Sequence, residues 1–190
     1  MKLYGAPMPA PNPRRVRIFL AEKGIDLPET PIRLMEGEHK SPEHRARNSL
    51  GQIPTLELDD GTCISETVAI CRYFEEIQPD PPLFGRSALE KAQVDMWVRR
   101  VEFTVMTPVA NVWRHAHPYT AKLLTQFKDF GESNRETYAG AQRWLNRELA
   151  DRPYLAGETF SVADICLLST VDFADWIGLP LSEDAVHLRA

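Results

Sequence analysis

The segment from residue 52 to residue 67 constrains the fold of this chain more than any other part of the sequence. A proline that opens a strand costs little, because the strand start needs no N–H from it, and Pro54 precedes the short run 55–58, in which polar and apolar residues alternate. That run, an Asp-Asp-Gly turn and a second run predict a β-hairpin. A cis bond between Ile53 and Pro54 would leave the backbone of Ile53 free to pair outside the sheet. Glu66 and Thr67 would then add a carboxylate and a hydroxyl, which suits a small peptide with an α-amino group.

The first 77 residues alternate between strand and helix signals. Val16, Phe19 and Leu20 form one apolar stripe of a helix that Gly24 ends, and Asn12 is a favoured residue at its start. The whole order, strand, helix, strand, helix, hairpin, helix, predicts a mixed sheet of the thioredoxin-like type. The expected strands besides the hairpin are at 2–5 and 30–34. The expected helices are one opened by Asn12 and Pro13, one at 42–48, and one after the hairpin with Ile70, Cys71, Phe74 and Ile77 on one face.

Strand signals disappear after a proline-rich linker over residues 78–88. The remaining chain, 89–190, is predicted to be an all-α domain. Its first long helix extends to about His115, with a kink or break at Pro108, and another covers 132–150. Ser161 and Asp164 have the spacing of a capping box at the start of a further helix.

Composition excludes several classes of function. The formal net charge is −5, whereas a nucleic-acid-binding protein needs clustered positive charge. No apolar run approaches the roughly 18 residues of a membrane-spanning helix. Three widely spaced cysteines argue against a disulfide framework and for a cytoplasmic setting.

The run Asn48–Pro54, followed by Ser65, Glu66 and Thr67, resembles the glutathione-binding half of the cytosolic glutathione transferases. This resemblance implies an α/β thioredoxin-like domain plus an all-α domain, the glutathione transferase fold. It implies a cytoplasmic homodimer that conjugates glutathione to small electrophiles, as in detoxification. An apolar residue near the linker, Phe84, suits either the dimer interface or packing within the chain.

The resemblance also assigns glutathione contacts. It pairs the backbone of Ile53 with the cysteine part of glutathione and places Glu66 and Thr67 on the γ-glutamyl end. Lys40, with His39, would meet the glycine carboxylate, and Gln52 would add a polar contact. Alternatively, Glu66 and Thr67 are only first-turn helix residues, and Lys40 is only a solvated surface lysine.

Catalysis requires a thiolate, and an ordinary thiol is only about 3% ionised at neutral pH. Family members use a serine, tyrosine or cysteine after the first strand to stabilise it, but residues 6–13 contain none of these. Asn12 is the remaining side-chain donor, and some bacterial and fungal relatives use an asparagine in this way. Asn12 is equally well explained as a helix cap. Tyr4 could supply a phenol, although a packed strand residue explains it better.

A second substrate would lie between the domains, where pockets are common. The proposed contacts are Met8, Met106, Asn111 and His115, although residues at helical spacing often belong to the core. His115 and His117 lack a third ligand, so no metal site is expected. No glycine-rich nucleotide motif is present.

Three functions remain open on these grounds. The first is a glutathione transferase, and the second is a glutathione-dependent disulfide reductase that takes a disulfide substrate. The third is a non-catalytic glutathione-binding dimeric module. Similar proteins usually continue with one or two more helices, so the second domain is expected to be short at its C-terminal end, by nature or by truncation.

Overall fold

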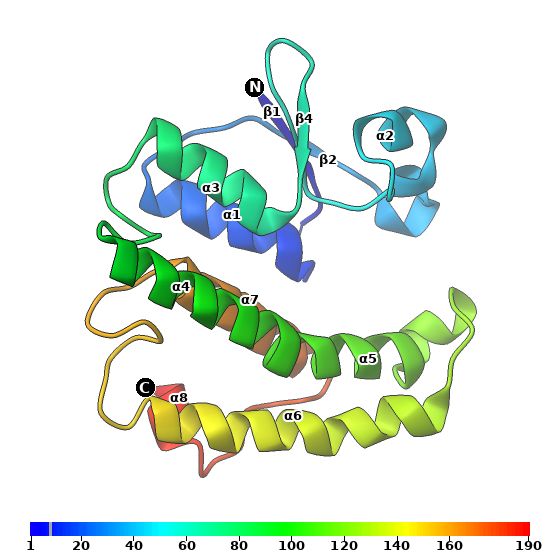
Figure 1. Ribbon diagram of the computed structural model, residues 1–190. Coiled ribbons are helices and arrows are strands. Elements are labelled where there is room, and N and C mark those ends of the chain that lie inside the picture. The colour runs from blue at the N-terminus through cyan, green and yellow to red at the C-terminus, as the bar shows by residue number, and fades with distance from the viewer. Residues whose placement is uncertain (8) are drawn as a thin grey trace. The chain divides into compact units, whose positions relative to one another are not determined.

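The structure is a computed structural model that describes residues 1–7 and 9–190. The chain divides into two units, Met1–Phe84 and Gly85–Ala190 (Figure 1). The first unit contains strands and helices, and the second contains helices, as the sequence predicted. Met8, one of the expected second-substrate contacts, lies outside the described residues.

A four-stranded mixed sheet forms the centre of the first unit, with the strand order β2-β1-β3-β4. Strand β1 is parallel to β2 and antiparallel to β3, which pairs in turn with β4 as the predicted hairpin. The predicted strand at 30–34 is wrong at its C-terminal end, because the chain turns into a 3-10 turn at Leu34. The strands are β1 (Lys2–Gly5), β2 (Glu29–Pro31), β3 (Thr55–Glu57) and β4 (Cys63–Ser65).

Two helices of this unit, α1 (Pro11–Glu22) and α3 (Thr67–Ile77), pack side by side (Figure 1). The predicted stripe of Val16, Phe19 and Leu20 is buried. A third helix, α2 (Pro42–Arg47), follows two 3-10 turns, η1 (Leu34–Glu36) and η2 (Glu38–Lys40). These connecting elements lead from the end of β2 to the hairpin.

The proline-rich segment after α3 belongs to the first unit as far as Phe84. Lys23 is buried and its Nζ lies 2.5 Å from Oε2 of Glu75, while it also donates to the carbonyls of Gln78 and Pro81. Phe84 is 1% exposed and packs edge-on against Phe19. Of the two roles considered for Phe84, packing within the chain is the one observed.

The second unit begins with a long helical stretch in three parts. Helix α4 (Ala88–Arg100) continues into a π-helical segment, η3 (Val101–Met106), and then into α5 (Thr107–His115). The wide turn directly precedes Pro108, which has no N–H for the regular pattern, and Thr107 Oγ1 donates to the carbonyl of Glu102 at 2.9 Å. The predicted break is therefore a π-helical segment.

The remaining helices of the second unit include α6, which starts four residues before the predicted position and packs along α5. At Gly131, a Cβ atom would lie 2.7 Å from the backbone of His115, so only glycine permits this approach. The predicted capping box is confirmed, since Ser161 N and Oγ both donate to Asp164 Oδ2 at 2.9 Å. The elements are η4 (Pro118–Lys122), α6 (Lys128–Glu148), α7 (Val162–Trp176) and α8 (Val186–Arg189).

Candidate functional site

The register of the strands brings most of the predicted site residues together at one end of the sheet, where several strands begin or end. Thr55, at the start of β3, pairs with Ser65, at the end of β4, so Ile53 and Glu66 leave the hairpin at the same end. Tyr4 also pairs with Thr55, which places the end of β1 and the loop toward α1 at the same end of the sheet. The parallel strand β2 ends there too and leads toward η2 (Figure 1).

The loop before β3 has the predicted cis peptide bond between Ile53 and Pro54. The carbonyl of Gln52 accepts from His44 Nε2 at 2.8 Å and from Asn48 Nδ2 at 3.0 Å. Both donors are buried, so this carbonyl is the anchor of the loop. Among the described residues, none forms a hydrogen bond with the backbone of Ile53, as the proposed pairing with a ligand requires.

Glu66 has a backbone conformation that side chains rarely adopt, with φ 70° and ψ 121°. It is exposed and stands as the N-cap of α3, yet its side chain does not cap the helix. Thr67 is buried at the first helical position. The first N–H groups of α3 therefore keep no side-chain partner in the described part of the chain, and a helix N-terminus of this kind favours a carboxylate.

Asn12 does not cap α1, so this alternative reading is wrong. The N-cap of the helix is Ala10, two residues before Asn12, and Asn12 lies in the first turn. Pro11 and Pro13 have no N–H, so the backbone N–H of Asn12 is the first-turn donor that remains. The half-buried side chain of Asn12 has no hydrogen-bond partner among residues 1–7 and 9–190, which leaves its amide available.

Lys40 is held against the loop that carries the site. Its Nζ donates to the carbonyl of Leu50 at 3.0 Å and to that of Gly51 at 2.8 Å. An ammonium group has three hydrogens, so one remains for a ligand carboxylate. Burial lowers the pKa of His39, with the charges of Lys40, His44 and Arg45 adding to the effect. His39 is therefore a weak choice for a cationic contact at neutral pH.

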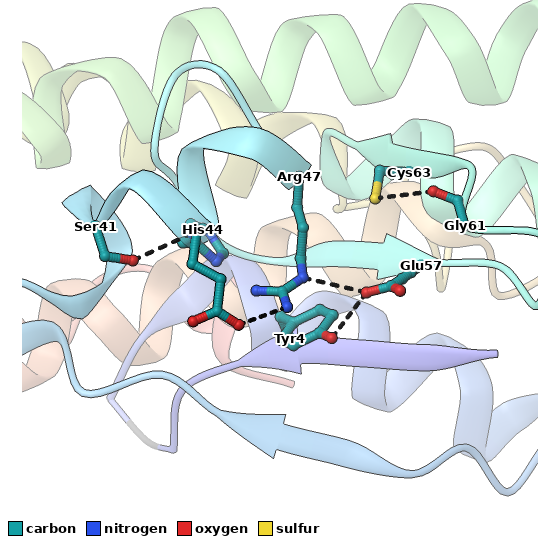
Figure 2. A network of polar contacts seen from close by, with 8 residues as sticks. Tyr4, Ser41, His44, Arg47, Glu57, Gly61 and Cys63 are labelled. Atoms are coloured by element: carbon teal, nitrogen blue, oxygen red, sulfur yellow. Dashed lines mark hydrogen bonds and ion pairs between the residues drawn. The ribbon is translucent and has the colours of Figure 1, made fainter.

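Tyr4 and Cys63 have environments that do not suit thiolate chemistry. The hydroxyl of Tyr4 donates to Glu57 Oε2 at 2.7 Å (Figure 2). Burial raises the pKa of Tyr4, and the hydrogen bond with Glu57 raises it further. Burial also raises the pKa of the Cys63 thiol, with a further contribution from Glu57. Neither group is prepared to activate or to replace the thiol of a substrate.

Two of the proposed second-substrate residues of the second unit have partners in α6 or at its N-cap. Asn111 Nδ2 donates to Asn134 Oδ1 at 3.1 Å, and Asn134 is buried. The ring of His115 lies 5.7 Å from that of Phe127 and its Nδ1 accepts from the backbone of the same residue. Both therefore contribute to packing within this unit. Met106 is half-buried at the end of η3.

Over the described ranges, no three His, Cys, Asp or Glu side chains are grouped so that they could hold a metal ion. The helices of residues 1–7 and 9–190 are too short or too polar to cross a membrane. All three cysteines are outside disulfide bonds.

Sequence reasoning missed the residues that support the site. His44 and Asn48 anchor the Gln52 carbonyl, and Arg47 contacts both Tyr4 and Glu57. The signal available was weak: His44 and Asn48 lie four residues apart on one helical face, but nothing in the sequence indicates that the face is buried.

Comparison with known proteins defines the class. Residues 10–77 match the family described as "Glutathione S-transferase, N-terminal domain", and residues 132–190 match the corresponding C-terminal domain. A fold with a mixed sheet and a helical unit, and a loop with a cis-proline, agree with this match. The chain belongs to the glutathione S-transferase family.

Individual relatives agree with that assignment. Glutathione S-transferase 2 of Saccharomyces cerevisiae is 38% identical over 194 residues, which cover 100% of this chain and 83% of the yeast protein. The crystal structure of Gtt2 from the same yeast superposes with a TM-score of 0.92 at 37% identity and covers 100% and 92% of the two chains. A maize glutathione S-transferase I in complex with an atrazine glutathione conjugate has a TM-score of 0.80 at 28% identity, with 99% and 88% covered.

Proposed function

We propose that this chain binds glutathione at the end of the sheet in its first unit where β3 begins and β4 ends. In this proposal Asn12 stabilises the glutathione thiolate, and the glutathione is transferred to small electrophiles. The thiol proton passes to solvent, the sulfur attacks the electrophilic carbon, and a leaving group departs with its bonding electrons. Membership of a transferase family supports the reaction class. The observation that carries the proposal is the unpaired backbone of Ile53 beside the uncapped N-terminus of α3.

Each end of glutathione has a partner of suitable chemistry in this proposal. The first-turn N–H groups of α3 and the hydroxyl of Thr67 receive the γ-glutamyl carboxylate, and Glu66 pairs with the α-amino group. Ile53 pairs with the cysteine backbone, while Lys40 and Gln52 contact the glycine end. This arrangement leaves the sulfur near the start of α1.

Asn12 is proposed to stabilise the thiolate through its side-chain amide and its backbone N–H. A helix N-terminus adds partial positive charge, which favours the thiolate further. Each unit by which the thiol pKa falls requires about 1.4 kcal/mol of preferential stabilisation of the thiolate. Two donors and a helix end supply effects of this size.

Replacing Asn12 tests the mechanism. Asn12→Ala should raise the pKa of bound glutathione toward that of the free thiol and lower kcat/KM for an aryl halide roughly tenfold to a hundredfold. Ultraviolet titration of the enzyme–glutathione complex measures the pKa directly. The control is Glu22→Ala, because Glu22 is an exposed residue at the far end of the same helix. Arg14 is less suitable as a control because it lies close to Asn12. An unchanged pKa in Asn12→Ala would remove Asn12 from the mechanism.

The second substrate is proposed to be a small electrophile that contacts Met106, Asn111 and His115 of the second unit. The maize relative in complex with an atrazine glutathione conjugate supports a small electrophile as the second substrate. A detoxifying role, a cytoplasmic location and a homodimeric state complete the proposal. Sedimentation velocity of the purified protein decides the oligomeric state. Reduction of a small mixed disulfide at a rate above aryl halide conjugation would favour the disulfide reductase instead.

A further inference from the structure

A polar network joins the end of α2 to two strands of the sheet (Figure 2). Arg47 is the last residue of α2, and its Nε donates to Glu57 Oε2 at 3.2 Å. The centre of the Arg47 guanidinium lies 4.4 Å from the centre of the Tyr4 ring. Tyr4 donates to the same oxygen of Glu57. Since Tyr4 belongs to β1 and Glu57 to β3, one guanidinium bridges the helix to both strands.

This network is partly withdrawn from water. Tyr4 is 6% exposed, and the side chains of Arg47 and Glu57 are 23% and 33% exposed. Arg47 also donates to Glu43 at 2.8 Å, but Glu43 is 79% exposed, so this pair contributes little. A guanidinium that stacks on a ring and pairs with a carboxylate has a defined orientation, which a lysine cannot reproduce.

Electrostatics keep the three groups complementary near neutral pH. The hydrogen bond from Tyr4 lowers the pKa of Glu57, and the charge of Arg47 lowers it further. Burial and the contact with Glu57 raise the pKa of Tyr4. Cys63, which faces the same carboxylate, stays a neutral thiol because its pKa is also raised. The network therefore consists of a carboxylate, a phenol donor and a guanidinium.

Helix α2 depends on such attachments. It has six residues, which is too short for a helix to be stable alone, and it contacts chiefly the 3-10 turn before it. Lys40 ends η2, with only the N-cap Ser41 between it and α2, and the loop with Gln52 and Ile53 follows α2. Motion of α2 relative to the strands would displace both segments together.

We propose that Arg47 is a positioning residue that fixes α2 on the sheet and thereby fixes Lys40 and the 48–54 loop for glutathione. This inference rests on the proposed glutathione site. Arg47 does not touch the reacting sulfur in this proposal. Its loss should weaken glutathione binding, because the loop must then be ordered at the expense of binding free energy, while the chemical step at Asn12 remains.

The test compares Arg47→Met, which keeps an unbranched apolar stem but removes the guanidinium and its charge, with Glu43→Gln as the matched control. Glu43→Gln removes only the exposed partner of Arg47 and should behave like the wild type. Arg47→Met should raise the calorimetric Kd for glutathione about three- to tenfold. Its kcat at saturating glutathione should stay within about twofold of the wild type. Arg47→Lys should restore only part of the affinity.

Amide hydrogen exchange gives a reading that does not depend on glutathione. Amides of residues 48–54 should exchange faster in Arg47→Met than in Glu43→Gln, while those of α1 stay unchanged. Wild-type affinity in Arg47→Met, or a loss of kcat equal to the loss of affinity, would overturn the positioning role. If the wild type did not bind glutathione, the proposed function would fail. Unchanged exchange at 48–54 would then also refute the attachment of the loop, whereas faster exchange would support it.

Discussion

Glu66 shows how one residue can trade stability for binding. Its φ of 70° lies in the left-handed region, and a conformation of this kind costs a non-glycine residue about 1–3 kcal/mol. The strain turns the chain from β4 into α3 without using a capping side chain. Because the Glu66 carboxylate is exposed, its place in the proposed site gives a reason to keep this residue instead of glycine.

Two substitutions separate the strain from the carboxylate. Glu66→Gly should be more stable than Glu66→Ala by about 1 kcal/mol. Glycine relieves the backbone strain, and the greater entropy of glycine in the unfolded chain offsets only part of that gain. Both variants should bind glutathione roughly tenfold or more weakly than the wild type, because both lack the charged partner of the α-amino group. Denaturant unfolding and calorimetry measure the two effects. Equal stability of the two variants would contradict the strain argument.

At the scale of the element, local signals predicted more than long-range ones. Strand β1, the hairpin with its proline, α3 and the capping box at Ser161 follow from turn residues and apolar periods that lie close together in the sequence. The predicted N-cap of α1 lies two residues too late, at Asn12, because Ala10 has no polar side chain that could mark it as the N-cap. The support of Gln52 by His44 could not be predicted, because it depends on how the loop folds back onto α2. The attachment of Arg47 could not be predicted either, because it depends on the pairing of β1 with β3.

Helix α4 begins with a capping box of Ser87 and Glu90, and α7 begins with that of Ser161 and Asp164. Because one is exposed and the other is partly buried, we expect their loss to lower the free energy of unfolding by different amounts. Asp164 accepts from Leu155 N at 2.8 Å and from Ser161, in a partly buried setting. Glu90 accepts from the backbones of Arg86 and Ser87 in an exposed one. Asp164→Ala should therefore lower the free energy of unfolding by about 2–4 kcal/mol, and Glu90→Ala by about 0.5–1 kcal/mol. Equal costs in denaturant unfolding would contradict the role of burial.

The pH dependence of Asp164 provides an independent check. Burial raises its pKa, and hydrogen bonds from Leu155 and Ser161 only partly oppose this shift. An acid whose pKa is higher in the folded state contributes stability that is present below the unfolded pKa and lost as the pH rises through the folded pKa. The stability of the wild type relative to Asp164→Asn should therefore fall as the pH rises above the ordinary aspartate range. A relative stability that rises over this interval would contradict the shift.

On the scale of the whole molecule, the boundary between the two units depends on a buried ion pair. The three prolines after Gln78 indicated a linker, yet the first unit extends to Phe84. Lys23 and Glu75 explain the difference, since Lys23 binds the carbonyl of Gln78 and Glu75 Oε1 accepts from the backbone of Phe84 at 3.1 Å. The segment is thus fixed to the unit that precedes it, although its composition is that of a spacer.

A double-mutant cycle tests this attachment. Lys23→Met leaves the Glu75 carboxylate buried without its cation and should lower the free energy of unfolding by about 3–5 kcal/mol. The double substitution Lys23→Met with Glu75→Leu removes both charges and should recover a large part of that loss, because no uncompensated charge stays buried. The exposed pair of Arg143 and Glu136, with side chains 63% and 79% exposed, is the matched control, and its loss should cost less than about 1 kcal/mol. The cycle also needs Glu75→Leu alone. If the double substitution lowered the free energy of unfolding by the sum of the two single effects, the two charges would not act as a pair. The end of the first unit would then need another explanation.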